Sequence, residues 1–175
     1  VIMPAAIMFP LLTTGHYAGG KWEMGIVEVV WGGGMLIGGV ILSIFKLKGS
    51  KVAAVNIMYV LLGLTFILSG VLPASWFVEF VMVTAIGGVS LSVFNGCFTA
   101  IVQPEVSPEK LGRVFSLYYS MAVWPSVIGL LFTGLIAEVI GVNITFIVSG
   151  CLAILVGILS FGTRNLMQLG KIKHV

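Results

Sequence analysis

The chain has 175 residues, of which 59% are hydrophobic and only 9% are charged, and its mean hydropathy is +1.17. Because soluble domains carry about 25% charged residues, a chain so poor in charge cannot cover a water-facing surface and must be solvated by lipid. Its nine basic residues are scattered among apolar runs, and they do not form the basic patch of a nucleic-acid-binding protein.

The N-terminal apolar segment, residues 1–12, lacks the basic region of a signal peptide and is shorter than the about 20 residues that cross a bilayer. We expect it to be the second half of a spanning helix, in a piece of a longer protein. Five further apolar segments are long enough to span: 22–45, 52–72, 76–102, 114–138 and 142–163. Their short connections make neighbours antiparallel. The sequence thus predicts an all-α membrane protein, a six-transmembrane-helix bundle with a truncated first helix.

The basic residues in the connections predict the orientation of this bundle. One side carries only Lys21. The other side carries eight basic residues, which are Lys46, Lys48, Lys51, Lys110, Arg113, Arg164, Lys171 and Lys173. Because cytoplasmic loops hold the excess of lysine and arginine, this second side and the C-terminus are expected to be cytoplasmic.

The glycine-rich stretch IVEVVWGGGMLIGG, residues 26–39, resembles the start of a nucleotide-binding turn, but the third glycine position of that fingerprint is Ile37. When the stretch and its flanking residues are placed on a helix at 100° per residue, their small and polar side chains form two stripes. One stripe, within an arc of about 60°, contains Gly25, Glu28, Gly32, Gly39 and Ser43, and the other contains Gly34 and Gly38. Small residues let membrane helices approach closely, so we expect helix packing on both faces.

Glu28 is the acidic residue on the first of these stripes. It lies six residues past Trp22, which places it about 9 Å inward from the outer interface. A charge near mid-membrane costs on the order of 3 kcal/mol, and such groups normally face protein or a water-filled cavity. Two interpretations stay open: a role in proton coupling or cation binding, or a hydrated glutamate of the outer leaflet paired with Lys21.

Polar or small residues also form stripes on three other predicted helices. Segment 76–102 carries Thr84, Gly88, Ser92, Asn95 and Thr99 within about 80°, which either line a cavity or hydrogen-bond a neighbouring helix. The stripes on 52–72 and 142–163 contain no charge and predict helix packing. They are Asn56, Gly63 and Gly70 on the first and Gly150, Ala153 and Gly157 on the second.

Enzyme and metal chemistry find little support in the sequence. The chain contains no aspartate and no His-Glu-x-x-His motif. Its two histidines, His16 and His174, lie on opposite sides of the predicted bundle, so they cannot share a metal ion. We therefore expect neither an enzyme nor a cofactor or metal site.

The loop 103–116 is the most distinctive polar segment, and its sequence predicts a helix start with Ser107 at the N-cap and Pro108 at the first helical position. Gly112-Arg113-Val114-Phe115-Ser116, preceded by Val106-Ser-Pro-Glu109, resembles the loop between helices 10 and 11 of the major facilitator superfamily. Further pieces resemble its macrolide-efflux and siderophore-exporter-like branch: Gly19-Gly20 before Trp22, Gly34-Met-Leu-Ile-Gly-Gly39, and Phe94-Asn95-Gly96.

This resemblance implies that the chain is the C-terminal half of a twelve-helix transporter, with its segments as helices 7–12. In the family, helices 7, 8, 10 and 11 surround the central cavity, and 9 and 12 are peripheral. The stripes of 22–45 and 76–102, as helices 8 and 10, would then face the cavity. One departure is the loop after helix 8, where Ser43 stands in place of the family's aspartate. The basic cluster Lys46, Lys48 and Lys51 remains and is expected to set the topology.

The resemblance further implies a secondary transporter in a bacterial inner membrane that exports small amphipathic compounds by proton-driven antiport and alternating access. Its partners would be the lipid bilayer, the N-terminal half of the same protein, the substrate and protons. The expected substrate and proton pathway comprises Glu28, Thr84, Ser92, Asn95 and Thr99. The alternative is a non-transporting assembly subunit or sensor built on the same helical bundle.

Overall fold

The computed structural model describes residues 8–44 and 50–162, and within these ranges the chain is helical, as predicted. The helices are α2 (Phe9–Gly15), α3 (Lys21–Ile44), α4 (Lys51–Val71), α5 (Phe77–Glu105), α6 (Pro108–Ile140) and α7 (Val142–Gly162). Five of the eight basic residues predicted for the cytoplasmic side lie outside the described residues, namely Lys46, Lys48, Arg164, Lys171 and Lys173.

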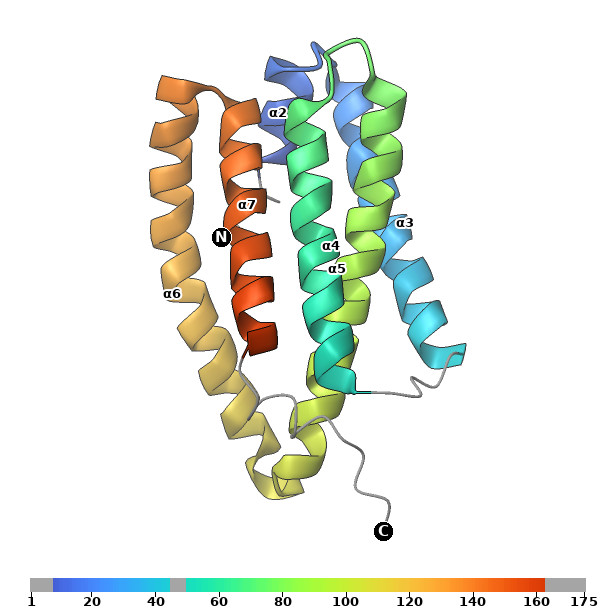
Figure 1. Cartoon of the computed structure of the whole chain (residues 1–175), viewed down its shortest axis with the longest axis vertical. Helices are drawn as coiled ribbons and strands as arrows, with labels where there is room; N and C mark the ends of the chain where they lie inside the picture. The colour runs from blue at the N-terminus through green and yellow to red at the C-terminus, as the bar shows by residue number, and fades with distance from the viewer. Residues whose placement is uncertain (1–7, 45–49, 163–175) are drawn as a thin grey trace.

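The five long helices form a row in the order α6, α7, α4, α5 and α3, with the short α2 packed against α3 and α7 near one end (Figure 1). Successive long helices run up and down, so the connections α3–α4 and α5–α6 lie at one end and α4–α5 and α6–α7 at the other. Two neighbouring pairs, α4 with α7 and α3 with α5, make the most extensive contacts. Helix α6 contacts mainly α7.

Four of the described helices are long and apolar enough to cross a membrane: α3, α4, α5 and α7. The predicted span 114–138 lies inside α6, which is helical throughout but is not among these four. The link between α5 and α6 is much shorter than the predicted polar loop, because only Val106 and Ser107 separate the two helices. Ser107 does occupy the N-cap position with Pro108 next to it, although its side chain makes no capping hydrogen bond.

The glycine stripes of α4 and α7 were each predicted to pack against a helix, and the structure packs them against one another. A Cβ on Gly63 would come within 2.8 Å of the carbonyl oxygen of Gly150, and a Cβ on Gly157 within 2.7 Å of Val60. A Cβ on Gly70 would meet the carbonyl oxygen of Asn143. These levels recur every seven residues along both helices, the spacing that keeps one seam of two antiparallel helices in contact. Close backbone approach supplies the packing where lipid gives no hydrophobic drive.

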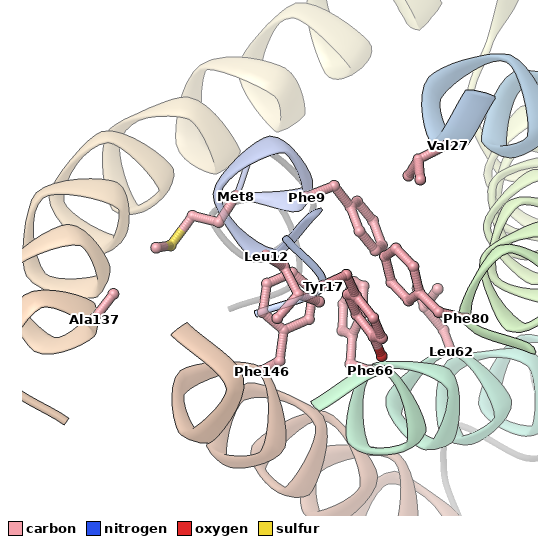
Figure 2. Packing of buried hydrophobic residues seen from close by; sticks show 10 residues of the cluster. All are labelled: Met8, Phe9, Leu12, Tyr17, Val27, Leu62, Phe66, Phe80, Ala137 and Phe146. Atoms are coloured by element: carbon pink, nitrogen blue, oxygen red, sulfur yellow. The ribbon is translucent and has the colours of Figure 1, made fainter. Parts of the chain in front are cut away.

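An aromatic cluster packs around α2 in the interior of the bundle (Figure 2). The ring of Phe9 packs at centroid distances of 5.1 to 6.1 Å against the rings of Trp31, Phe66, Phe80 and Phe146, which come from α3, α4, α5 and α7. Rings at these distances add favourable edge and stacking contacts to the burial of their surface. The short α2 therefore contacts all four spanning helices through the ring of Phe9.

Two side chains just after α2 tie its end to α4. The hydroxyl of Tyr17 donates a hydrogen bond to the carbonyl oxygen of Ser69 (2.8 Å), and Nε2 of His16 donates to that of Leu72 (2.8 Å). The Tyr17 ring stacks on Phe80 with centroids 4.3 Å apart. Burial raises the pKa of the Tyr17 hydroxyl above its ordinary value.

Candidate functional site

Gly34 and Gly38 of α3 lie against α5. A Cβ on Gly34 would meet the backbone carbonyl of Ala85, and one on Gly38 would come within 2.7 Å of the carbonyl oxygen of Val89. Gly88 of α5 in turn faces the backbone of Trp31. Four residues separate the glycines and their partners on both helices, so α3 and α5 run parallel in fixed register. Because the backbones touch, this contact leaves no room for side chains.

The other stripe of α3 is open. Nothing lies within 4 Å of a Cβ built on Gly25 or Gly32, and a Cβ on Gly39 would make only an ordinary contact of 3.7 Å with Oγ of Ser92. Of the glycines predicted to pack helices here, Gly34, Gly38 and Gly88 do so, whereas Gly39 makes only an ordinary contact and Gly32 makes none. Glu28 on this stripe is exposed, and no ion pair joins it to Lys21 within the described part of the chain.

One edge of the polar stripe of α5, formed by Thr84 and Asn95, turns toward the side of the bundle on which α2 packs. Phe80 contacts Phe9 and Tyr17 on that side. Thr84 lies one turn beyond Phe80, and Asn95 lies eleven residues beyond Thr84, which returns to the same face after three turns. The Thr84 side chain is 1% exposed and its hydroxyl donates to the carbonyl of Phe80 (2.8 Å). The Asn95 side chain is exposed.

The Glu28 stripe of α3 faces the same side. Trp31 packs on Phe9 at a centroid distance of 5.1 Å, and Glu28 precedes Trp31 by three residues, so the two side chains are neighbours on the helix surface. We call this common face of α3 and α5, marked by Glu28 and Asn95, the α2-side face. One residue of each predicted stripe, Glu28 and Asn95, thus lies on this face, whereas Gly88 and Ser92 of the α5 stripe pack against α3.

The candidate pathway residues nevertheless do not form one cluster. The register of Gly34 with Ala85 places Glu28 beside the first turns of α5. Asn95 lies about 15 residues further along, which corresponds to roughly 20 Å of helix. Ser92 and Thr99 are half-buried near the Asn95 level. The face therefore has an acidic group toward one end and an amide toward the other, separated by roughly 20 Å along the helix axis.

A chain of aromatic rings near the Asn95 end is a feature that sequence reasoning missed. Centroid distances of 4.7 to 6.4 Å connect rings from α4, α5 and α6 in the order Tyr59, Phe94, Phe98, Tyr118, Tyr119 and Phe115. Tyr118 and Tyr119 are exposed. The four-residue spacing within Phe94/Phe98 and Phe115/Tyr119 was the available signal, since such pairs share a helix face. We call this set the aromatic series.

The structure describes some of the residues predicted for the cytoplasmic loops. Nζ of Lys51 donates a hydrogen bond of 3.1 Å to the carbonyl oxygen of Ala100. Gly112 and Arg113 lie exposed in the first turns of α6, and nothing lies within 4 Å of a Cβ on Gly112. Across the described ranges, no group of three histidine, cysteine or acidic side chains could hold a metal ion.

The comparisons with known proteins agree with this architecture. The family model of the Major Facilitator Superfamily matches residues 2–168. Macrolide efflux protein A of Streptococcus pyogenes is 37% identical over 158 residues, which cover 90% of this chain and 39% of that protein. The protein of the same name from Enterococcus faecalis is 36% identical over 130 residues, covering 74% of this chain and 40% of that protein.

A further relative is the uncharacterized MFS-type transporter YfiS of Bacillus subtilis, 31% identical over 51% of this chain and 21% of that protein. No solved structure matches the chain. The chain spans about two-fifths of the length of the two macrolide efflux proteins. With the family model matching nearly all of its residues and several apolar spanning helices, this multi-pass membrane chain belongs to the Major Facilitator Superfamily.

Proposed function

We propose that the chain is the C-terminal six-helix half of a bacterial secondary transporter that exports small amphipathic drugs. The observation that carries this proposal is the 37% identity to a macrolide efflux protein across 90% of this chain. The match covers 39% of that relative's length, as expected if this chain corresponds to somewhat less than half of a twelve-helix protein. The helices α2 to α7 would then correspond to helices 7 to 12 of the family.

The charge pattern supports a cytoplasmic C-terminus. Lys51, Lys110 and Arg113 lie at the end of the bundle that holds the α3–α4 and α5–α6 connections. Lys21 lies at the opposite end, where α2 and its aromatic cluster are found. By the positive-inside rule, the end of the bundle that holds the aromatic cluster is extracellular. The membrane would be the plasma membrane of a bacterium.

The α2-side face supports a transport pathway. A carboxylate that faced lipid hydrocarbon would cost on the order of 3 kcal/mol, so the exposed Glu28 belongs beside protein or in a water-filled cavity. The N-terminal half of the protein would lie against this face and rock on it, in the manner of alternating access between two halves. Glu28 would exchange protons with the outer side, and the Asn95 region with its aromatic series would meet substrate from the inner side.

The aromatic series predicts a measurable substrate contact. Tyr118→Ala in the full-length protein removes a ring that is 37% exposed, and a ring contact with an apolar substrate is worth about 0.5–1.5 kcal/mol. The substrate concentration at half-maximal export is therefore expected to rise by roughly 2- to 12-fold. Tyr118→Phe keeps the ring and should leave this concentration close to the wild-type value. Equal effects of both substitutions would show that the hydroxyl, and not the ring, makes the contact.

The proposed function itself is tested in cells. The full-length protein is expressed in a bacterial host that lacks its own major drug exporters, and intracellular accumulation is measured for a panel of amphipathic compounds that includes macrolides. We expect at least one compound to accumulate less than in cells carrying the empty vector, with the difference abolished by a protonophore. If no compound on the panel responds although the protein reaches the membrane, the non-transporting assembly or sensor role is favoured.

A further inference from the structure

An apolar cavity of about 320 Å³ lies between α3, α4 and α5. Its walls are formed by Ile41 and Leu42 of α3, Met58 and Leu61 of α4, and Ile86, Val89, Ser90 and Val93 of α5. The one hydroxyl among them, that of Ser90, donates to the carbonyl of Ile86 in its own helix (2.8 Å). The cavity therefore offers no polar group to a ligand, and water has nothing to bind there.

The cavity opens away from the α2-side face. Val93 lies nine residues beyond Thr84, which places it half a turn around α5 from the polar stripe. Two of its wall residues, Ile41 and Ile86, are exposed on the outer surface of the bundle. Because all three helices are apolar enough to span a membrane, the cavity is entered from the hydrocarbon core of the bilayer and not from the proposed transport pathway.

The cavity continues toward the inner end of the bundle as a groove between α4 and α5, and Lys51 lies at the end of this groove. Lys51 precedes Met58 by seven residues and Ala100 follows Val93 by seven, so each lies two turns from the cavity on the same face of its helix. Nζ of Lys51 contacts the Ala100 carbonyl oxygen across the groove. The ammonium is thus about 10 Å from the cavity along the helix, at the first residue of α4.

The position of this ammonium is built into α5. Pro104 lies in the last turn of that helix, and because proline has no N–H, the carbonyl of Ala100 cannot accept the usual helical hydrogen bond from the residue four positions later. Lys51 supplies the missing donor at 3.1 Å. An ammonium has three N–H donors, so a hydrogen bond to Ala100 leaves two that can point to an acceptor at the membrane surface.

We propose that the groove between α4 and α5 binds an anionic phospholipid, with one acyl chain in the cavity and the phosphate on Lys51. The wholly apolar cavity matches a hydrocarbon chain. The ammonium, at the level where α4 enters the membrane, matches a phosphodiester, and basic pockets between spanning helices are known to hold lipid headgroups. The 10 Å step between them is the depth that separates a headgroup from the middle of its chain within a leaflet of about 15 Å of hydrocarbon.

The experiment uses the full-length protein in vesicles that contain a trace of phosphatidylglycerol or of phosphatidylcholine with a photoreactive diazirine on the acyl chain. After illumination, labelled residues are mapped by mass spectrometry of peptides. We expect the phosphatidylglycerol probe to label the cavity walls, at Met58, Leu61 and Val89, about fivefold more than the phosphatidylcholine probe. That ratio is the effect of one lysine on an anionic lipid at a membrane surface.

Two variants locate the contacts. Lys51→Gln should make the two probes label the cavity equally, because the charge is lost while the side chain keeps much of its length. Val93→Phe fills the cavity and should reduce labelling by both probes. Val78→Phe is the control, since it makes the same change on the same helix at a position that is 66% exposed.

Equal labelling by the two probes in the wild-type protein, a comparison that needs no variant, would overturn the role of Lys51. Labels spread evenly over the outer surface, without enrichment at the cavity, would overturn the acyl-chain site. Neither result depends on whether the protein exports drugs, because the assay measures lipid contact alone.

Discussion

Gly34→Ala is expected to destabilise the protein by about 2–3 kcal/mol. The new Cβ would overlap the backbone carbonyl of Ala85, with the carbonyl carbon at 3.1 Å and the Cα at 3.3 Å. Backbone atoms cannot move aside as a flexible side chain can, so α3 must separate from α5. The fraction of folded protein is measured against temperature or denaturant in detergent micelles.

The neighbouring glycine provides the matched control. Nothing lies within 4 Å of a Cβ on Gly33, so Gly33→Ala should be neutral or should stabilise the protein by up to about 1 kcal/mol, the advantage of alanine over glycine in a helix. The two substitutions add the same methyl group to adjacent residues of one helix. Equal stability of the two variants would contradict the close approach of α3 and α5.

Glu28→Gln is expected to abolish export that is driven by a proton gradient, since glutamine keeps the shape of the side chain but cannot bind and release a proton. Movement of substrate down its own concentration gradient should persist, because the helices and the aromatic series are unchanged. The measurement compares uphill and downhill transport of one substrate by the full-length protein.

Glu138→Gln serves as the control for this variant, because Glu138 is exposed near the end of α6 and lies outside the proposed pathway. It should export as the wild-type protein does. Uphill export by the Glu28→Gln variant at the wild-type rate would remove Glu28 from the mechanism. The proton-binding group would then lie elsewhere in the full-length protein.

The sequence predicted the helices and one of the two central interfaces well. Asn56, Gly63 and Gly70 on α4 and Gly150 and Gly157 on α7 follow a simple period, and close packing in lipid depends on small residues at such a period. The structure pairs those two stripes with each other. The period alone could not say which helices pair, since nothing local to a helix identifies its neighbour.

The sequence was a weaker guide where contacts join distant segments. The ring of Phe9 meets rings from four helices, and no spacing within the short segment 1–12 indicates this. The hydroxyl of Thr84 bonds within its own helix, an option that every threonine on a helix has and that sequence cannot rank against a cavity or a neighbour. The groove between Lys51 and Ala100 likewise depends on how α4 and α5 are paired.

The helix start at Pro108 was predicted, but the continuation of α5 through Pro104 to Glu105 was not. The segment 103–113 contains two prolines and four charged residues, a composition typical of a loop. Pro104 falls in the last turn of α5, where few hydrogen bonds depend on it, and Pro108 falls in the first turn of α6, where its fixed backbone angle suits a helix. Both prolines are therefore compatible with helices that extend beyond the hydrocarbon core.

The central claim, that the chain is half of a proton-coupled exporter, is tested most directly in proteoliposomes. The purified full-length protein is reconstituted, a proton gradient is imposed, and the movement of a substrate found in the cell-based panel is followed with and without the gradient. We expect the gradient to drive substrate against its concentration gradient and a protonophore to stop this movement. Substrate movement that is the same with and without the gradient, in vesicles shown to be sealed, would contradict it.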